Sequence, residues 1–98
     1  MRFTQNDFNL YHDAILGRTT ELLGKVFDHV KVTVTYEPCT MAIEVRATCV
    51  HRGRSYGRAQ CFDVQCFLYN GPEFYSGYLR DRLPAEFARD IIDYIMRS

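Results

Sequence analysis

Residues 30–62 read VKVTVTYEPCTMAIEVRATCVHRGRSYGRAQCF. Apolar and polar residues alternate strictly over Val30–Tyr36, which is the period of a strand with one buried face. The alternation resumes over Met41–Arg52, after a turn in which Pro38 fixes the backbone φ angle. The two stretches therefore predict an antiparallel hairpin.

A third strand follows from the second glycine-bearing turn, His51-Arg52-Gly53-Arg54. Residues 55–62 return beside the second strand, with the small residues Gly57, Ala59 and Cys61 on one face. Apolar character continues as far as Tyr69, which is too long for one strand, so we expect a bend near Asp63. Asn70-Gly71-Pro72 predicts a further turn.

Both flanks of this segment have helical periodicity. Thr4 and Asp7 form an N-terminal capping signal before an apolar face that runs to about Asp28, and a break at Gly17 is the alternative. A second helix begins at Leu83, with Pro84 in its first turn. Its apolar face consists of Phe87, Ala88, Ile91, Ile92 and Ile95. Residues 73–79 fit neither template cleanly, and we predict a short fourth strand, with a tyrosine-rich loop as the alternative.

Together these elements predict an α+β fold of the order α-β-β-β-(β)-α, in which two amphipathic helices pack on one face of an antiparallel sheet. The 98 residues are enough for one globular domain, residues 1–98. The other sheet face is expected to stay open to solvent. Alternation assigns to it Lys31, Thr33, Thr35, Glu44, Arg46, Thr48, Val50, Arg52, Tyr56, Arg58 and Gln60.

The composition predicts a chain that folds without a disulfide bond or a structural metal ion. Hydrophobic residues make up 47% of the chain, and 12 basic residues balance 12 acidic ones. Neither a membrane span nor a signal peptide is visible, so we expect a cytoplasmic protein. In that compartment the cysteines remain reduced thiols. They are Cys39, Cys49, Cys61 and Cys66.

Motifs for catalysis or metal binding are weak. Only Cys61 and Cys66 approach the close spacing of zinc ligands, so we expect no metal and no cofactor. Cys49 and His51 are the best nucleophile and base pair, but residues two apart on a strand are poorly placed for it. No phosphate-binding glycine loop or Ser-His-Asp signature is present. The sequence therefore predicts a protein without enzymatic activity.

Positive charge is concentrated in one part of this neutral chain. No acidic residue lies between Glu44 and Asp63, whereas four arginines and one histidine do. An uncompensated basic hairpin attracts an acidic partner, and tyrosine and arginine are enriched at the energetic centres of interfaces. The expected partner-binding residues are Arg46, Arg52, Arg54, Tyr56, Arg58, Tyr69, Phe74, Tyr75 and Tyr78. The structural alternative is that the arginines pair with Glu37 or Glu44 across strands.

The order helix, three strands, helix is similar to that of the double-stranded-RNA-binding domain. In that family a lysine-rich start of the second helix contacts phosphate, and the loop between the first strands has glycine-proline-histidine character. The stretches at these two places here are Arg80-Asp81-Arg82-Leu83-Pro84, which contains an acidic residue, and Glu37-Pro38-Cys39-Thr40, which lacks the glycine-proline-histidine character. The resemblance implies binding of RNA by the same fold.

The small size and the helix-sheet-helix plan are also similar to phage-encoded inhibitors, including anti-CRISPR proteins, by fold-level analogy. Our leading hypothesis is a protein-binding module, an inhibitor or adaptor, whose partner is a protein or a nucleoprotein complex. The alternative is an RNA- or DNA-binding domain that uses the same basic hairpin. A homodimer through a sheet edge or the glycine-bearing helix face stays open.

Overall fold

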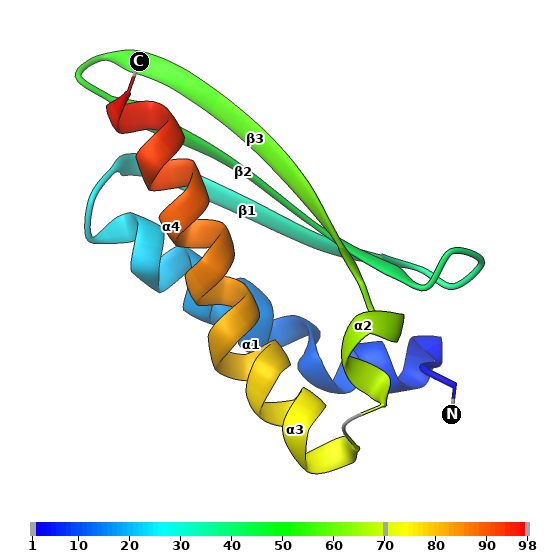
Figure 1. Ribbon diagram of the computed structural model, residues 1–98. Helices are drawn as coiled ribbons and strands as arrows, with labels where there is room; N and C mark the ends of the chain where they lie inside the picture. The colour runs from blue at the N-terminus through cyan, green and yellow to red at the C-terminus, as the bar shows by residue number, and fades with distance from the viewer. Residues whose placement is uncertain (1, 70, 98) are drawn as a thin grey trace.

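The computed structural model describes residues 2–69 and 71–97, in which helices cover one face of an antiparallel sheet (Figure 1). The predicted α+β class is confirmed. The elements in chain order are α1 (Gln5–Gly24), β1 (Asp28–Glu37), β2 (Ala42–His51), β3 (Arg54–Asp63), α2 (Gln65–Leu68), α3 (Pro72–Gly77), the π-helix η1 (Tyr78–Arg82) and α4 (Leu83–Met96).

The sheet has the order β1-β2-β3, and both pairs of strands are antiparallel. β2 and β3 are joined through Arg52 and Gly53 alone, because His51 is already paired with Arg54. Both turn residues have positive φ, 53° and 75°, which is the conformation of a type I′ turn. This short turn fixes the register of β3 against β2.

The register of β3 overturns one prediction. Cys49 lies opposite Tyr56 and Ala47 opposite Arg58, and both β2 residues face the helices and are buried. Tyr56, Arg58 and Gln60 therefore lie on the helix side of the sheet, and their predicted place on the open face is wrong. Gly57, Ala59 and Cys61 occupy the open face instead. The physical reason is turn length, because a two-residue turn sets which face each β3 residue takes.

The core lies between the inner sheet face and the helices. β1 contributes Val32, Val34 and Tyr36. β2 contributes Ile43, Val45, Ala47 and Cys49, while Phe62 is the buried residue of β3. Against them pack Phe8, Ile15 and Leu23 of α1 and Leu83, Phe87, Ala88, Ile91 and Ile95 of α4. The apolar face predicted for the last helix is confirmed apart from Ile92, which is half-buried.

α1 runs without a break through Gly17 and ends at Gly24, so the alternative break is wrong. Its start is fixed by a capping box, in which Asp7 N–H donates to Thr4 Oγ1 at 3.1 Å and Thr4 N–H donates to the Asp7 carboxylate at 2.9 Å. Val26, expected on the buried face, lies beyond the helix and is exposed.

The segment predicted as a fourth strand is helical, so that prediction is wrong. Pro72 takes the first turn of α3, where its missing N–H costs nothing. Phe74 and Tyr78 are four residues apart and stack at 6.4 Å between ring centroids. The expected bend near Asp63 is confirmed, because β3 ends there and α2 follows. In the expected turn Asn70-Gly71-Pro72, Asn70 lies outside the described residues, and Gly71 has a φ of 87°.

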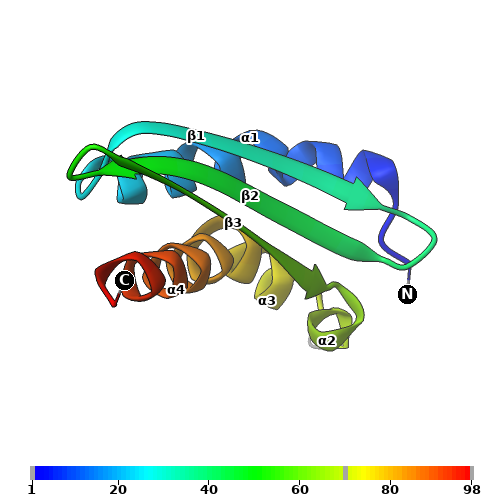
Figure 2. The same cartoon turned by 90° about the horizontal axis from the view of Figure 1, so that it is seen from above.

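The two long helices are not equally covered by the sheet. α1 packs under β1, whereas α4 packs mainly against α1 and η1 and contacts β3 far less. Seen from above, α4 lies beside β3 and outside the outline of the sheet (Figure 2). β3 therefore forms an outer strand with a helix along its flank.

Candidate functional site

The arginine turn, defined here as Arg52, Gly53 and Arg54, lies at one end of the molecule next to the last turn of α4 (Figure 1). Both arginines are exposed. Among the described residues, neither Arg52 nor Arg54 has a carboxylate within ion-pair distance. Their charges are therefore directed into solvent, as predicted for a basic hairpin tip.

The other two arginines of the basic segment have contacts within the chain. Arg46 lies on the open face, and its Nη2 is 3.2 Å from Glu44 Oε1 two residues along the same strand, whereas the structural alternative predicted a pair across strands. Arg58 lies on the helix side, with its guanidinium carbon 5.0 Å from the ring centroid of Tyr94 on α4. Tyr56 meets the same ring edge to face at 6.5 Å. The segment is thus divided between two faces.

A groove between β3 and α4 extends from the arginine turn. One hollow of about 310 Å³ is lined by His51, Arg52, Arg54, Tyr56, Ile95 and Met96. A second, of about 420 Å³, is lined by Arg58, Asp90, Asp93, Tyr94 and Arg97. We call these two hollows the β3–α4 groove. Arginines from the turn, β3 and the end of α4 outnumber its two carboxylates, and Asp90 already lies 3.8 Å from Arg89.

The α4 residues of this groove were missed by the sequence reasoning. Asp90, Asp93, Tyr94 and Arg97 recur three and four residues apart and so share one side of the helix. The signal available was an aromatic residue on the polar side of an otherwise regular amphipathic helix. It was not used because the prediction placed Arg58 and Tyr56 away from the helices.

The predicted aromatic residues other than Tyr56 lie at the opposite end of α4 from the arginine turn (Figure 1). Tyr69 and Phe74 are 92% and 40% exposed and can reach a partner. Tyr75 and Tyr78 are half-buried, and Tyr75 packs edge to face against Phe3 and Tyr11, both at 6.0 Å. The structure therefore does not bring all the predicted residues into one surface.

Burial also changes the pKa values of the two half-buried tyrosines, Tyr75 and Tyr78. It raises the pKa of Tyr78, as do the charge of Glu86 and the hydrogen bond, 3.4 Å long, between that carboxylate and the phenol. Burial likewise raises the pKa of Tyr75, with smaller contributions from Tyr11 and Asp7. Both phenols are thus held in their neutral form, which suits a packing role.

The cysteines offer little for nucleophilic chemistry. Cys49 is 1% exposed, and its burial raises the pKa of the thiol, so the thiolate is disfavoured at neutral pH. The His51 ring packs edge to face against Phe27 at 5.5 Å. A hydrogen bond with Glu37 and the charge of that carboxylate raise the pKa of Cys39. Cys61 is exposed on the open face.

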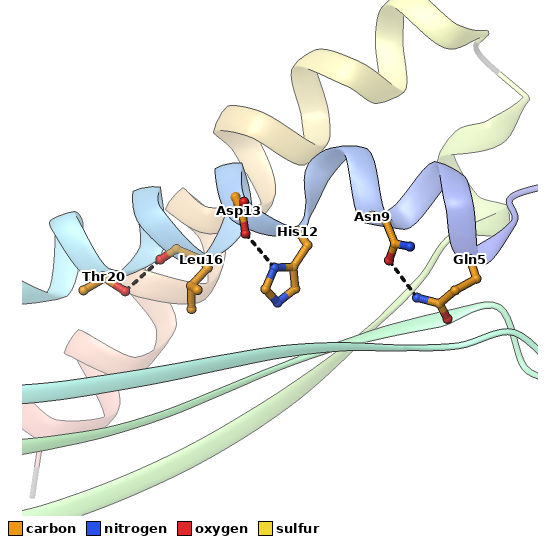
Figure 3. A network of polar contacts seen from close by, with 6 residues as sticks. All are labelled: Gln5, Asn9, His12, Asp13, Leu16 and Thr20. Atoms are coloured by element: carbon orange, nitrogen blue, oxygen red, sulfur yellow. Dashed lines mark hydrogen bonds and ion pairs between the residues drawn. The ribbon is translucent and has the colours of Figure 1, made fainter.

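The polar side of α1 is occupied by local contacts (Figure 3). Gln5 donates to Asn9 at 3.0 Å, and the Thr20 hydroxyl donates to the Leu16 carbonyl at 2.7 Å. His12 is half-buried, with its Nδ1 3.0 Å from Asp13 Oδ1. These pairs lie along the helix and do not converge on a pocket.

No group of three potential metal ligands occurs within residues 2–69 and 71–97. In the same part of the chain, every helix is too short or too polar to cross a bilayer. Comparison of the chain with family models, with curated proteins and with solved structures gave no match. The arginine turn and the β3–α4 groove are therefore the features from which a function can be inferred.

Proposed function

We propose that this chain is a non-catalytic protein-binding module, an inhibitor or adaptor, which holds an acidic surface of its partner with Arg52 and Arg54. One observation carries the proposal. Arg52 occupies a left-handed position, φ 53°, in a turn where asparagine, aspartate and glycine are favoured. Such a conformation costs a non-glycine residue about 1 kcal/mol or more, and no ion pair within the described chain offsets it.

The groove supplies a second anchor beside the turn. Arg58 over Tyr94 presents a guanidinium and a ring edge together, and both residue types are enriched at the energetic centres of protein interfaces. Tyr69 and Phe74, at the far end, are available for peripheral contacts with a large partner. Phage-encoded inhibitors of the anti-CRISPR type are one class with this size and plan.

Two observations favour a protein over a nucleic acid as partner. The net charge is zero, whereas domains dominated by phosphate binding are usually basic overall. At the start of the last helical segment, where the double-stranded-RNA-binding family contacts phosphate, Arg80 lies over the Tyr11 ring at 5.2 Å and Arg82 over the Tyr78 ring at 6.0 Å. Asp81 lies between them in the sequence, whereas that family is lysine-rich at this place.

The proposal places the protein in the cytoplasm. All four cysteines are free thiols, three of them exposed, which suits a reducing compartment.

The test compares two charge-reversal variants of the tagged chain. Arg52→Glu/Arg54→Glu changes the arginine turn, and Arg2→Glu/Arg80→Glu changes net charge equally at exposed positions away from it. Each bait captures proteins from nuclease-treated extract of the source cells. The partner identified with the unchanged chain is then purified and titrated against each variant.

We expect the purified partner to bind the unchanged chain and the control variant alike, and to bind the Arg52→Glu/Arg54→Glu variant at least about tenfold more weakly. Equal binding to all three chains refutes the proposal. Capture that vanishes with nuclease refutes it in favour of nucleic acid, for which log affinity falls with log salt by about 0.9 per phosphate contacted.

A further inference from the structure

Among the described residues, no strand pairs with the backbone N–H and C=O groups along the outer edge of β3. In a two-residue hairpin the pair flanking the turn, here His51 and Arg54, exchanges backbone hydrogen bonds, and bonded pairs then alternate along the strands. The bond from Val64 N–H to the Met41 carbonyl, 2.9 Å long, fits the same alternation at the far end. The even-numbered β3 residues therefore bond to β2, and Ser55, Gly57, Ala59 and Cys61 direct their N–H and C=O groups outward.

Proline, lysine and a bulge, which protect many outer strands, are absent from β3, and its two arginines, Arg54 and Arg58, lie on the helix side. The β2–β3 register is continuous. The residues that face the edge carry small side chains on the open face, so an approaching backbone meets no bulk there. Among the described residues, no further backbone hydrogen bond reaches these four positions.

The helix layer extends past the edge of the sheet at β3. α4 packs mainly against α1 and η1 and contacts β3 far less. α4 accordingly lies outside β3 (Figure 2). The β3–α4 groove is thus placed where a fourth strand would cover α4.

We propose that this edge receives one extended segment of the partner protein, which adds to β3 as a fourth strand; the inference rests on the proposed protein-binding function. Its helix-side residues would neighbour Arg54, Tyr56 and Arg58 across the strands. The segment therefore carries two acidic side chains four residues apart, opposite the two arginines, and an apolar side chain midway between them, against Tyr56. We expect strands without acidic side chains at these two positions to bind more weakly, because they leave both arginines unpaired.

A second copy of this chain does not fit the same place. If β3 paired with β3 of another copy, the two α4 helices would lie on the same side of one continuous sheet. Each lies outside its own β3, so both would enter the same space, whereas packed helix axes need about 8–10 Å. A single strand without its own helix meets no such obstacle.

The test uses fluorescein-labelled peptides of about twelve residues, slightly longer than the ten residues of β3. The designed peptide is centred on Glu-Thr-Val-Thr-Glu. Its control has the same composition with the glutamates three apart, which places them on opposite faces of the strand. We expect anisotropy titrations to show about tenfold tighter binding of the designed peptide.

Backbone pairing is tested separately from charge. When the peptide adds antiparallel to β3, N-methylation of the two threonine amides blocks the bonds to β3, whereas N-methylation of the valine amide leaves them intact because that N–H points away. On the protein, Ala59→Pro removes an outward N–H, and Ala59→Val keeps it. We expect about tenfold weaker binding for the blocked peptide and for Ala59→Pro, and a change within about twofold for each control.

Loss of binding in both blocked forms, with retention in both controls, supports strand addition. If Ala59→Pro does not fold, the methylated peptides decide alone. Equal binding of blocked and control forms, or no preference for the designed spacing, overturns strand addition. Should the protein partner still lose binding to Arg52→Glu/Arg54→Glu in that case, the proposed function stands and only the docking mode fails.

Discussion

The Tyr36 hydroxyl ties the N-terminal segment to the end of β1. It donates to the Phe3 carbonyl oxygen at 2.6 Å in a buried position, and its ring stacks on Phe8 at 5.4 Å and meets Phe3 edge to face at 5.3 Å. Tyr36→Phe keeps all of these ring contacts and removes only the hydrogen bond. The variant therefore isolates one polar contact in a strand that is otherwise apolar on its inner face.

The expected loss is about 1.5 kcal/mol of unfolding free energy, because the substitution removes one hydrogen bond and leaves a buried carbonyl unpaired. For a domain of 98 residues this corresponds to a fall in Tm of about 6–12 °C. The denaturant m-value should not change, since the same surface is exposed on unfolding.

Alkaline pH supplies a second readout with a definite sign. Burial raises the pKa of Tyr36 above its ordinary value of 10.0. Below pH 10 both the folded and unfolded chains keep the proton, and the stabilisation is complete. Above pH 10 the unfolded chain loses the proton more readily, so stability falls as pH rises towards the folded-state pKa. Tyr36→Phe should lose less stability than the unchanged chain over that interval.

Thermal and urea unfolding followed by circular dichroism, at about pH 7 and about pH 11, measure both effects. Tyr69→Phe is the matched control, because Tyr69 is 92% exposed, and its Tm should stay within about 1 °C. A Tyr36→Phe variant as stable as the unchanged chain at neutral pH would refute the structural role assigned to this hydroxyl. If Tyr36→Phe lost as much stability at alkaline pH as the unchanged chain, the direction assigned to the pKa shift of Tyr36 would be refuted.

Three further substitutions test local energetics by the same unfolding measurements. Gly17→Ala should stabilise by about 0.5–1 kcal/mol, because no neighbour lies within 4 Å of an added Cβ in the middle of α1; a loss of stability would contradict that space. Thr19→Val should stabilise by about 1 kcal/mol, because the Thr19 hydroxyl is buried without a hydrogen-bond partner among the described residues. A loss of stability of the same size would instead indicate that this hydroxyl forms a hydrogen bond. Arg52→Asn should stabilise by about 0.5–1 kcal/mol through its tolerance of positive φ while weakening partner binding, and unchanged binding would argue against the anchor.

The sequence predicted secondary structure best for the strands and helices that have one fully buried face. The valine-threonine alternation of β1 and the aliphatic face of α4 predicted both elements, because burial imposes the period directly. β3 was harder, since its inner side carries Arg58 and Gln60 next to a helix that only partly covers it. The register could have been derived from the Arg52-Gly53 turn, had the hairpin been read as two residues long.

The candidate site was predicted in its residue types and less well in its arrangement. Adjacency in sequence grouped Arg46 with Arg58, although the strands place them on opposite faces. The helical segment after Gly71 was missed because its aromatic residues obscure the period, while Pro72 and Glu73 are ordinary signals of a helix start.

The wide turn of η1 has a consequence for how this chain tolerates change in length. A π-helical turn holds one residue more than an α-helical turn, so it offsets the sequence period of α3 by one residue relative to that of α4. Removing one residue between Tyr78 and Arg82 would leave an ordinary α-helical turn of the same rotation, so the preceding aromatic residues would keep their direction around the axis. A natural or engineered deletion there would therefore leave Phe74 and Tyr75 in place, whereas a deletion within α4 would turn them by about 100° relative to the residues that follow.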